Sequence, residues 1–193
     1  MEWILASASP RREELFKQLI PQFEIVPACG EEETEDVSTP WELAETLACQ
    51  KAEEVASLPS SHGKAVLGAD TVVALGDEIF GKPKDEADAY RMLKALSGKT
   101  HQVYTGVCLL FPVGNGRLIK RSATACTQVV FQPLTDGQIR DYIATGSPMD
   151  KAGAYGIQDG VLVYEIQGSF SNVVGLPVEL CAELLAQWEK ERK

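Results

Sequence analysis

Apolar and polar positions follow two different periods along this chain, and together they predict strands and helices in a mixed order. Short apolar runs predict strands, and apolar residues that recur every three or four positions predict helices. The predicted strands lie at 3–6, 23–28, 65–80 (two pieces with a hairpin turn at 76–77), 101–111, 118–131 and 161–168. The predicted helices lie at 10–19, 40–57, 86–96, 135–144 and 175–190. This order favours one α/β domain over 1–193, in which the central β-rich stretch forms a lobe of its own.

Composition and charge restrict the class of partner. The chain has 193 residues, a net charge of −10 and 45% hydrophobic residues, as in ordinary globular proteins. We expect no nucleic-acid polymer as partner, because polymer binding needs a basic stripe, whereas a few local bases can still hold a small anion. No apolar stretch is long enough to span a bilayer, and no secretory signal is visible. The five cysteines are scattered without a C-x-x-C pair, which is typical of reduced thiols in a cytoplasmic protein.

The segment SASPRR at 7–12 puts two arginines into the first turn of a predicted helix. The positive end of the helix dipole lies there, so basic residues are normally disfavoured. This helix start suits a phosphate ligand. It combines free backbone N–H groups with the hydroxyls of Ser7 and Ser9 and the guanidinium groups of Arg11 and Arg12. The alternative is that the arginines form surface ion pairs with the two glutamates that follow them.

Two charged residues interrupt apolar patterns. Lys51 shares one i, i+4 row of a predicted helix with Leu43, Leu47 and Val55, so it either extends along the surface into solvent or points into a cleft. Asp70 lies between two apolar strand pieces, where a carboxylate is unfavourable unless it is paired or binds a metal. Asp70 therefore marks either an exposed bend or a functional site, and we favour the site.

Two further segments contribute polar groups. Lys82 precedes the helix predicted at 86–96, and its role is open on the sequence alone. The Gly-rich segment 146–160 is longer than most connections, which favours a functional loop over a merely tight one. Within it, Gln158 offers both a donor and an acceptor to a nucleobase edge.

Guanidinium, ammonium and carboxylate groups are thus predicted on separate loops of one domain. Metal-assisted hydrolysis of a phosphoanhydride needs this mixture, because cations neutralise the phosphates while carboxylates hold a divalent ion and deprotonate water. The chain has no G-x-x-x-x-G-K-[ST] motif, so it is not a P-loop nucleotide hydrolase.

The chain resembles the Maf (septum-formation inhibitor) nucleotide pyrophosphatases from end to end. The resemblance rests on SASPRR (7–12), QKA (50–52), GADTVV (68–73), GKP (81–83), LSGKTHQVYTGV (96–107), DKAGAYGIQ (150–158) and NVVGLP (172–177). It implies a fold similar to that of the inosine-triphosphate pyrophosphatases, with a mixed central sheet flanked by helices, a cleft between two lobes and a homodimer. The implied reaction converts a nucleoside triphosphate to the monophosphate and pyrophosphate with the help of a divalent cation (Mg²⁺, Mn²⁺ or Co²⁺).

The resemblance also implies roles for individual residues. Asp70 falls on the family's proton acceptor and, with Glu32, on its metal-binding acids. The family's phosphate-facing positions are occupied by Arg11, Arg12, Lys51 and Lys82. A departure lies at 29–32, where this chain has Cys-Gly-Glu-Glu and the family more often has Asp-Val-Asp-Glu.

Within the family, one branch prefers dTTP and UTP and another prefers 7-methyl-GTP. The residues at the positions associated with that choice, Arg11, Thr71 and Gln158, resemble the dTTP/UTP branch. Two alternatives stay open: a nucleotide-binding regulator of cell division whose hydrolysis is incidental, and a house-cleaning enzyme whose true substrates are modified pyrimidine triphosphates.

Overall fold

The computed structural model describes residues 1–31, 34, 37 and 39–191. Its strands are β1 (Trp3–Leu5), β2 (Glu24–Ile25), β3 (Ala65–Leu75), β4 (Glu78–Phe80), β5 (Thr100–Pro112), β6 (Leu118–Phe131) and β7 (Val163–Gln167). Among the described residues these seven strands form one sheet in the order β2-β1-β3-β5-β6-β7, and β4 pairs with the end of β3. Strand β1 is parallel to β2 and β3, and the other pairs are antiparallel. The sheet is therefore mixed, as the sequence predicts.

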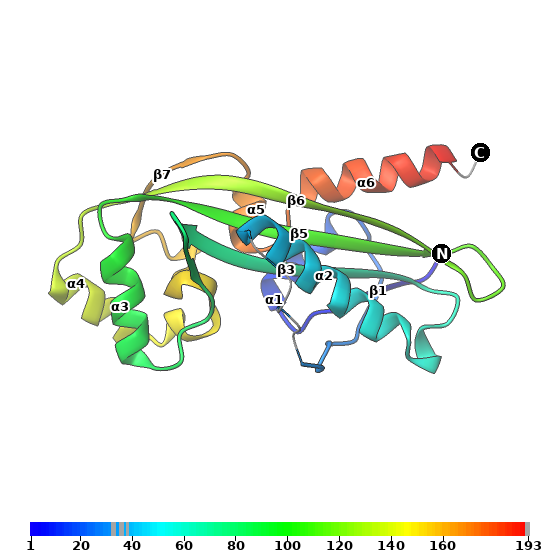
Figure 1. The fold of residues 1–193 in the computed structure, drawn as a ribbon, viewed down its shortest axis with the longest axis horizontal. Helices are drawn as coiled ribbons and strands as arrows, with labels where there is room; N and C mark the ends of the chain where they lie inside the picture. Colours follow the sequence, from blue (N-terminus) through cyan, green and yellow to red (C-terminus); the bar gives the residue numbers. More distant parts are fainter. Residues whose placement is uncertain (32–33, 35–36, 38, 192–193) are drawn as a thin grey trace.

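Helices cover both faces of the sheet and one of its ends (Figure 1). The α-helices are α1 (Pro10–Lys17), α2 (Pro40–Ala56), α3 (Glu86–Leu96), α4 (Asp136–Ala144), α5 (Phe170–Val174) and α6 (Val178–Glu191). The short 3-10 turns are η1 (Pro59–Ser61), η2 (Ser147–Asp150), η3 (Ala152–Ala154) and η4 (Ile157–Asp159). Figure 1 shows β3, β5 and β6 running most of the length of the molecule, with α3 and α4 at one end.

The predicted helix starts are confirmed by their caps. Ser9, Thr39, Asp85 and Thr135 each precede a helix, and each side-chain oxygen accepts a hydrogen bond from the backbone N–H three residues on. These bonds satisfy N–H groups that have no partner within the helix.

Alternation along the strands builds a core on each face of the sheet. Leu67 and Leu109 face one side, where they pack with residues of α1 and α6, such as Phe16. Their neighbours Val66 and Leu110 face the other side and pack with α2. Because side chains alternate along a strand, one run of apolar residues supplies both cores.

Helix α2 lies unusually close to the sheet at two glycines. A Cβ atom on Gly106 of β5 would lie 2.2 Å from the carbonyl oxygen of Ala44, and one on Gly68 of β3 would lie 2.4 Å from that of Ala48. Both neighbours are backbone atoms of α2. Only residues without a side chain allow this approach, which sets the position of α2 over β3 and β5.

A third core lies at the far end of the sheet. It joins α3 and α4 to the ends of β3, β5 and β6 through residues such as Phe80, Leu93 and Phe131. His101 and Tyr155 are buried in the same region, with 2.8 Å between His101 Nε2 and the Tyr155 hydroxyl. The molecule thus has two packed ends. The expectation that the central β-rich stretch forms a lobe of its own is wrong, because β5 and β6 contribute residues to the cores at both ends.

The structure differs from the sequence prediction in three segments. The predicted strand at 23–28 is reduced to the two residues of β2, the loop at 146–160 contains the turns η2 to η4, and the short helix α5 was not predicted. Each of these elements is too short for its periodicity to be visible in the sequence. Among the described residues, no helix is both long enough and apolar enough to cross a bilayer.

Candidate active site

A cavity of about 500 Å³ lies where the two packed ends meet. Its walls come from α1, α2, β3, the β4–α3 turn, the 150–158 segment and α5. Eight of the residues predicted from the sequence line it: Ser9, Arg11, Arg12, Lys51, Asp70, Thr71, Lys82 and Gln158. The tertiary structure therefore gathers side chains that are far apart in the sequence.

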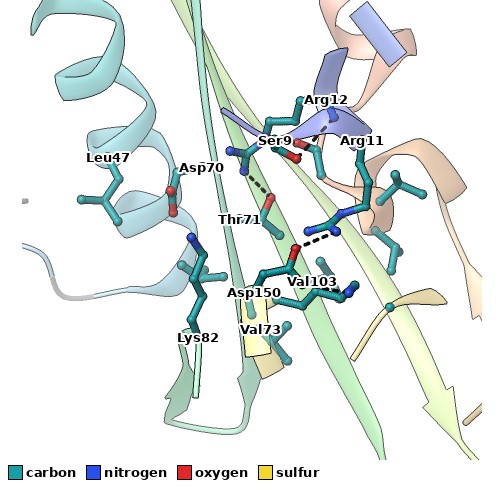
Figure 2. A pocket seen from close by; sticks show the side chains of 18 of the residues that line it. Ser9, Arg11, Arg12, Leu47, Asp70, Thr71, Val73, Lys82, Val103 and Asp150 are labelled. Atoms are coloured by element: carbon teal, nitrogen blue, oxygen red, sulfur yellow. Dashed lines mark hydrogen bonds and ion pairs between the residues drawn. The ribbon is translucent and has the colours of Figure 1, made fainter. Parts of the chain in front are cut away.

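Arg12 is held by a set of hydrogen bonds at the start of α1 (Figure 2). Its Nε donates to the carbonyl of Gly175 at 2.7 Å, and its Nη2 donates to the hydroxyl of Thr71 at 3.1 Å. Burial lowers the pKa of Arg12, and the nearby charge of Asp70 opposes that shift. The guanidinium group is therefore fixed in one orientation beside the cavity.

Arg11 points across the cavity to the 150–158 segment. Its Nη1 lies 3.0 Å from Oδ2 of Asp150 (Figure 2). The alternative that both arginines form ion pairs with the glutamates that follow them is wrong: Arg12 bonds Gly175 and Thr71, and Glu13 pairs with Lys17. Both arginines therefore line the cavity and do not pair with the glutamates of their own helix.

Asp70 and Lys51 form an ion pair inside the cavity, between Lys51 Nζ and Asp70 Oδ1. Asp70 lies within the continuous strand β3, not at a bend between strands, and its side chain is 14% exposed. Leu43 and Leu47 line the same wall as Lys51, so the row of α2 that the lysine interrupts faces the cavity. Of the two possibilities for Lys51, the structure supports a lysine directed into a cleft.

The other predicted residues lie at different depths. Lys82 is exposed, and its side chain points toward Asp70 in Figure 2. Gln158 is exposed at the rim. Ser7 is buried behind the cavity wall, where its hydroxyl accepts hydrogen bonds from Arg12 Nη1 at 3.4 Å and from the backbone N–H of Ser9 at 3.2 Å. Glu32, the second predicted metal-binding acid, lies outside the described residues.

Sequence reasoning missed the groups that hold these side chains in place. The hydroxyls of Thr71 and Thr105 are 3.0 Å apart, and Thr105 donates to the backbone carbonyl of Asn172 at 2.9 Å. Asp150, which pairs with Arg11, was not predicted as a site residue either. Thr105 is buried in the middle of β5. Its polarity in an apolar strand and its place in the family-matching segment 96–107 were the available signals.

Charge and shape together define what the cavity suits. Two guanidinium groups and the ammonium groups of Lys51 and Lys82 face a small space that also contains Asp70. Several cations around one concave site suit a ligand with several negative charges, such as a polyphosphate. The apolar wall formed by Leu43, Leu47 and other residues suits a flat ring next to those charges.

Sequence comparison assigns the chain to a family. The family model described as "Maf-like protein" matches residues 2–188. The chain belongs to the Maf family. This confirms the resemblance noted in the sequence.

Two relatives illustrate how similar other Maf proteins are. The dTTP/UTP pyrophosphatase of Carboxydothermus hydrogenoformans is 47% identical over 190 residues, which cover 97% of this chain and 99% of the relative. The dTTP/UTP pyrophosphatase of Thermococcus gammatolerans is 49% identical over 183 residues, which cover 94% of each chain.

Solved structures support the fold of this Maf protein. The Ham1 protein of Staphylococcus aureus is 17% identical with a TM-score of 0.51, and the match covers 100% of both chains. A HAM1 protein from Coxiella burnetii is 16% identical with the same TM-score of 0.51, over 97% of this chain and 99% of the other. The expected architecture, a mixed central sheet flanked by helices, is therefore confirmed.

Proposed function

We propose that this Maf protein hydrolyses nucleoside triphosphates, chiefly dTTP, UTP and modified pyrimidine triphosphates, to the monophosphate and pyrophosphate. The observation that carries the proposal is the cavity of about 500 Å³ that Arg11, Arg12, Lys51 and Lys82 line together with Asp70. The names of the relatives, dTTP/UTP pyrophosphatases at 47% and 49% identity, support the same reaction and substrate class.

Asp70 is the proposed general base. It accepts a proton from a water molecule while the water oxygen attacks the α-phosphorus, and the bond from that phosphorus to its bridging oxygen breaks to release pyrophosphate. Lys51, paired with Asp70, orients the carboxylate. Arg11, Arg12 and Lys82 hold the β- and γ-phosphates and offset the negative charge that develops on the leaving group.

A divalent cation, Mg²⁺, Mn²⁺ or Co²⁺, is the proposed cofactor. Among the described residues no three His, Cys, Asp or Glu side chains cluster as a metal site, and Asp70 is the carboxylate that fits as one ligand. We propose Glu32 as the second ligand. A bound cation neutralises phosphate charge. Removal of metal with a chelator should abolish pyrophosphate release, and titration of each ion back into the assay identifies the one that restores it.

Substitution of Asp70 tests the mechanism. Asp70→Asn keeps the size of the side chain but removes the base, so turnover should fall by roughly 10²–10⁴. Binding of a non-hydrolysable triphosphate, measured by calorimetry, should stay within a few-fold of the wild type. The matched control is Asp77→Asn in the turn after β3, which should leave turnover unchanged. An Asp70→Asn variant that retains most of its activity would show that another group is the base.

Gln158 is the proposed reader of the pyrimidine edge. It lies at the cavity rim with an amide that can both donate and accept. Thr71, whose hydroxyl is engaged by Arg12 and Thr105, acts on substrate choice through the position of Arg12. Gln158→Ala should change the UTP-to-GTP ratio of kcat/KM more than it changes the affinity for inorganic triphosphate. Equal losses for both nucleotides would assign Gln158 to phosphate binding instead.

A homodimer and a cytoplasmic location complete the proposal. Val161, Tyr164 and Phe170 are exposed apolar side chains around the outer strand β7, which suits an interface between two copies. All five cysteines are free thiols, as expected in a reducing compartment. The homodimer is tested by light scattering after gel filtration, which measures the molecular mass in solution. Tyr164→Lys should shift that mass toward the mass of a monomer.

A further inference from the structure

A second groove, separate from the candidate active site, lies between α2 and β6 and contains Cys49. Ser122 of β6 donates a hydrogen bond to Glu45 at 2.7 Å, and Lys120 of β6 pairs with Glu53 at 3.0 Å. Glu45, Cys49 and Glu53 follow one another at four-residue spacing on α2, so they lie on one row of the helix. The two contacts therefore place Cys49 directly over the β6 segment between Lys120 and Ser122.

Cys108 lies beneath the same point. In the β5–β6 register Cys108 is the partner of Ser122, and in the β3–β5 register it is the partner of Gly68. Gly68 is one of the two glycines that allow α2 to approach the sheet closely. Cys108 is fully buried in the core under α2, and Cys49 packs against that core. The Cys49 and Cys108 side chains thus lie next to each other where α2 packs on β5.

Cys49 is also open to small reagents and is chemically activated. It is half-buried and lines a groove of about 460 Å³ together with Trp41 and Gln50. The interaction with Cys108 lowers the pKa of Cys49, and Ser122 and Lys120 lower it further, while burial and the charge of Glu53 act in the opposite direction. An accessible thiolate is the form of cysteine that reacts with oxidants.

We propose that Cys49 and Cys108 form a peroxide-sensitive dithiol that oxidises to a reversible disulfide between α2 and β5. The Cys49 thiolate attacks one oxygen of hydrogen peroxide, the O–O bond breaks, and Cys49 becomes a sulfenic acid while hydroxide leaves and takes up a proton to form water. The Cys108 sulfur then attacks the Cys49 sulfur, and the sulfenic oxygen leaves as water with the Cys108 proton. Two electrons pass from the sulfurs to the peroxide, which is reduced to two water molecules.

The other cysteines do not share this arrangement. Cys29 and Cys126 are exposed, and burial raises the pKa of Cys126. Cys181 is buried in the core on the opposite face of the sheet, and burial raises its pKa to about 12. The oxidation is therefore expected to select one pair out of five thiols, and the inference does not depend on the proposed catalytic activity.

Peptide mapping of the intact, folded chain tests the proposal. The protein is treated with hydrogen peroxide, free thiols are blocked by alkylation, and the digest is analysed by mass spectrometry without reduction. We expect a peptide pair linked through Cys49 and Cys108, a loss of two of the five free thiols, and full recovery of the thiols with dithiothreitol. Cys126→Ser, the matched control, should give the same linked pair at the same yield.

A second variant separates the two steps. In Cys108→Ala the partner thiol is missing, so peroxide should leave a sulfenic acid on Cys49 that dimedone traps. The wild-type peptide map decides the question by itself, even where Cys108→Ala does not fold. The proposal is overturned by wild-type protein in which the linked pair is absent after peroxide treatment, or in which pairs containing Cys29 or Cys126 form in equal yield.

Discussion

Substitution of Gly106 by alanine should separate α2 from the sheet and displace a catalytic side chain. The added methyl group would lie 2.2 Å from the carbonyl oxygen of Ala44 and 2.5 Å from the backbone nitrogen of Glu45. Both atoms belong to the backbone of α2, so no change of side-chain rotamer relieves the clash. Ordinary van der Waals contact begins at 3.4 Å, so the helix has to retreat by about 1.2 Å, the difference between the two distances.

The size of the effect follows from that displacement. Overpacking of a dense core destabilises the folded state by about 1–3 kcal/mol. Lys51 lies on the same helix and pairs with Asp70, so the retreat also shifts the ammonium group relative to the carboxylate. A displacement of about 1 Å at a catalytic group lowers kcat/KM by roughly 10²-fold.

Two measurements check this prediction. Urea unfolding at equilibrium gives the free energy of unfolding, and release of pyrophosphate from UTP gives kcat/KM. The matched control is Gly137→Ala in the first turn of α4, where the nearest atom to the added methyl group is 3.9 Å away. That control should leave kcat/KM unchanged and raise stability by up to about 1 kcal/mol, because alanine favours a helix over glycine.

The outcome that refutes the reasoning is a Gly106→Ala protein with wild-type stability and wild-type kcat/KM. Loss of stability with unchanged kcat/KM would show that α2 relaxes without moving Lys51. That result would separate the packing of the helix from the geometry of the site.

Three further changes give independent checks. Burial lowers the pKa of His101 from 6.5 to about 4 in the folded protein. Between these two pKa values the unfolded chain binds a proton at His101 that the folded chain does not bind. The free energy of unfolding should therefore fall by about 2 kcal/mol between pH 7 and pH 5 because of this group. Urea titrations at both pH values should show that dependence reduced in His101→Asn and retained in His62→Asn at an exposed position. Arg12→Lys cannot reproduce both the bond to the Gly175 carbonyl and the bond to the Thr71 hydroxyl, so kcat/KM with UTP should fall roughly 10- to 100-fold. A loss under three-fold would contradict the assigned role. Thr105→Val keeps the shape but leaves one buried and one partly buried hydrogen bond unmade, so urea unfolding should show a loss of about 1–3 kcal/mol. Unchanged stability would show that these bonds contribute nothing.

Local sequence patterns determined most of the secondary structure of this protein. The helix over 86–96 and the strand over 118–131 have the predicted bounds, because periodicity and capping act between residues close in the chain. The same patterns exposed Lys51 and Asp70 as exceptions, since a charge in an apolar row is visible without knowledge of the fold.

Only the tertiary structure decided which of these residues meet. Lys51 and Asp70 pair because Gly68 and Gly106 let α2 settle against β3 and β5, and Arg11 reaches Asp150 across 139 positions of the chain. The contact of Cys49 with the core around Cys108 depends on the same packing. Strand register and the approach of a helix to a sheet are set by contacts between distant segments. The sequence therefore identified several of the site residues, and the packing of the folded chain determined which of them contact each other.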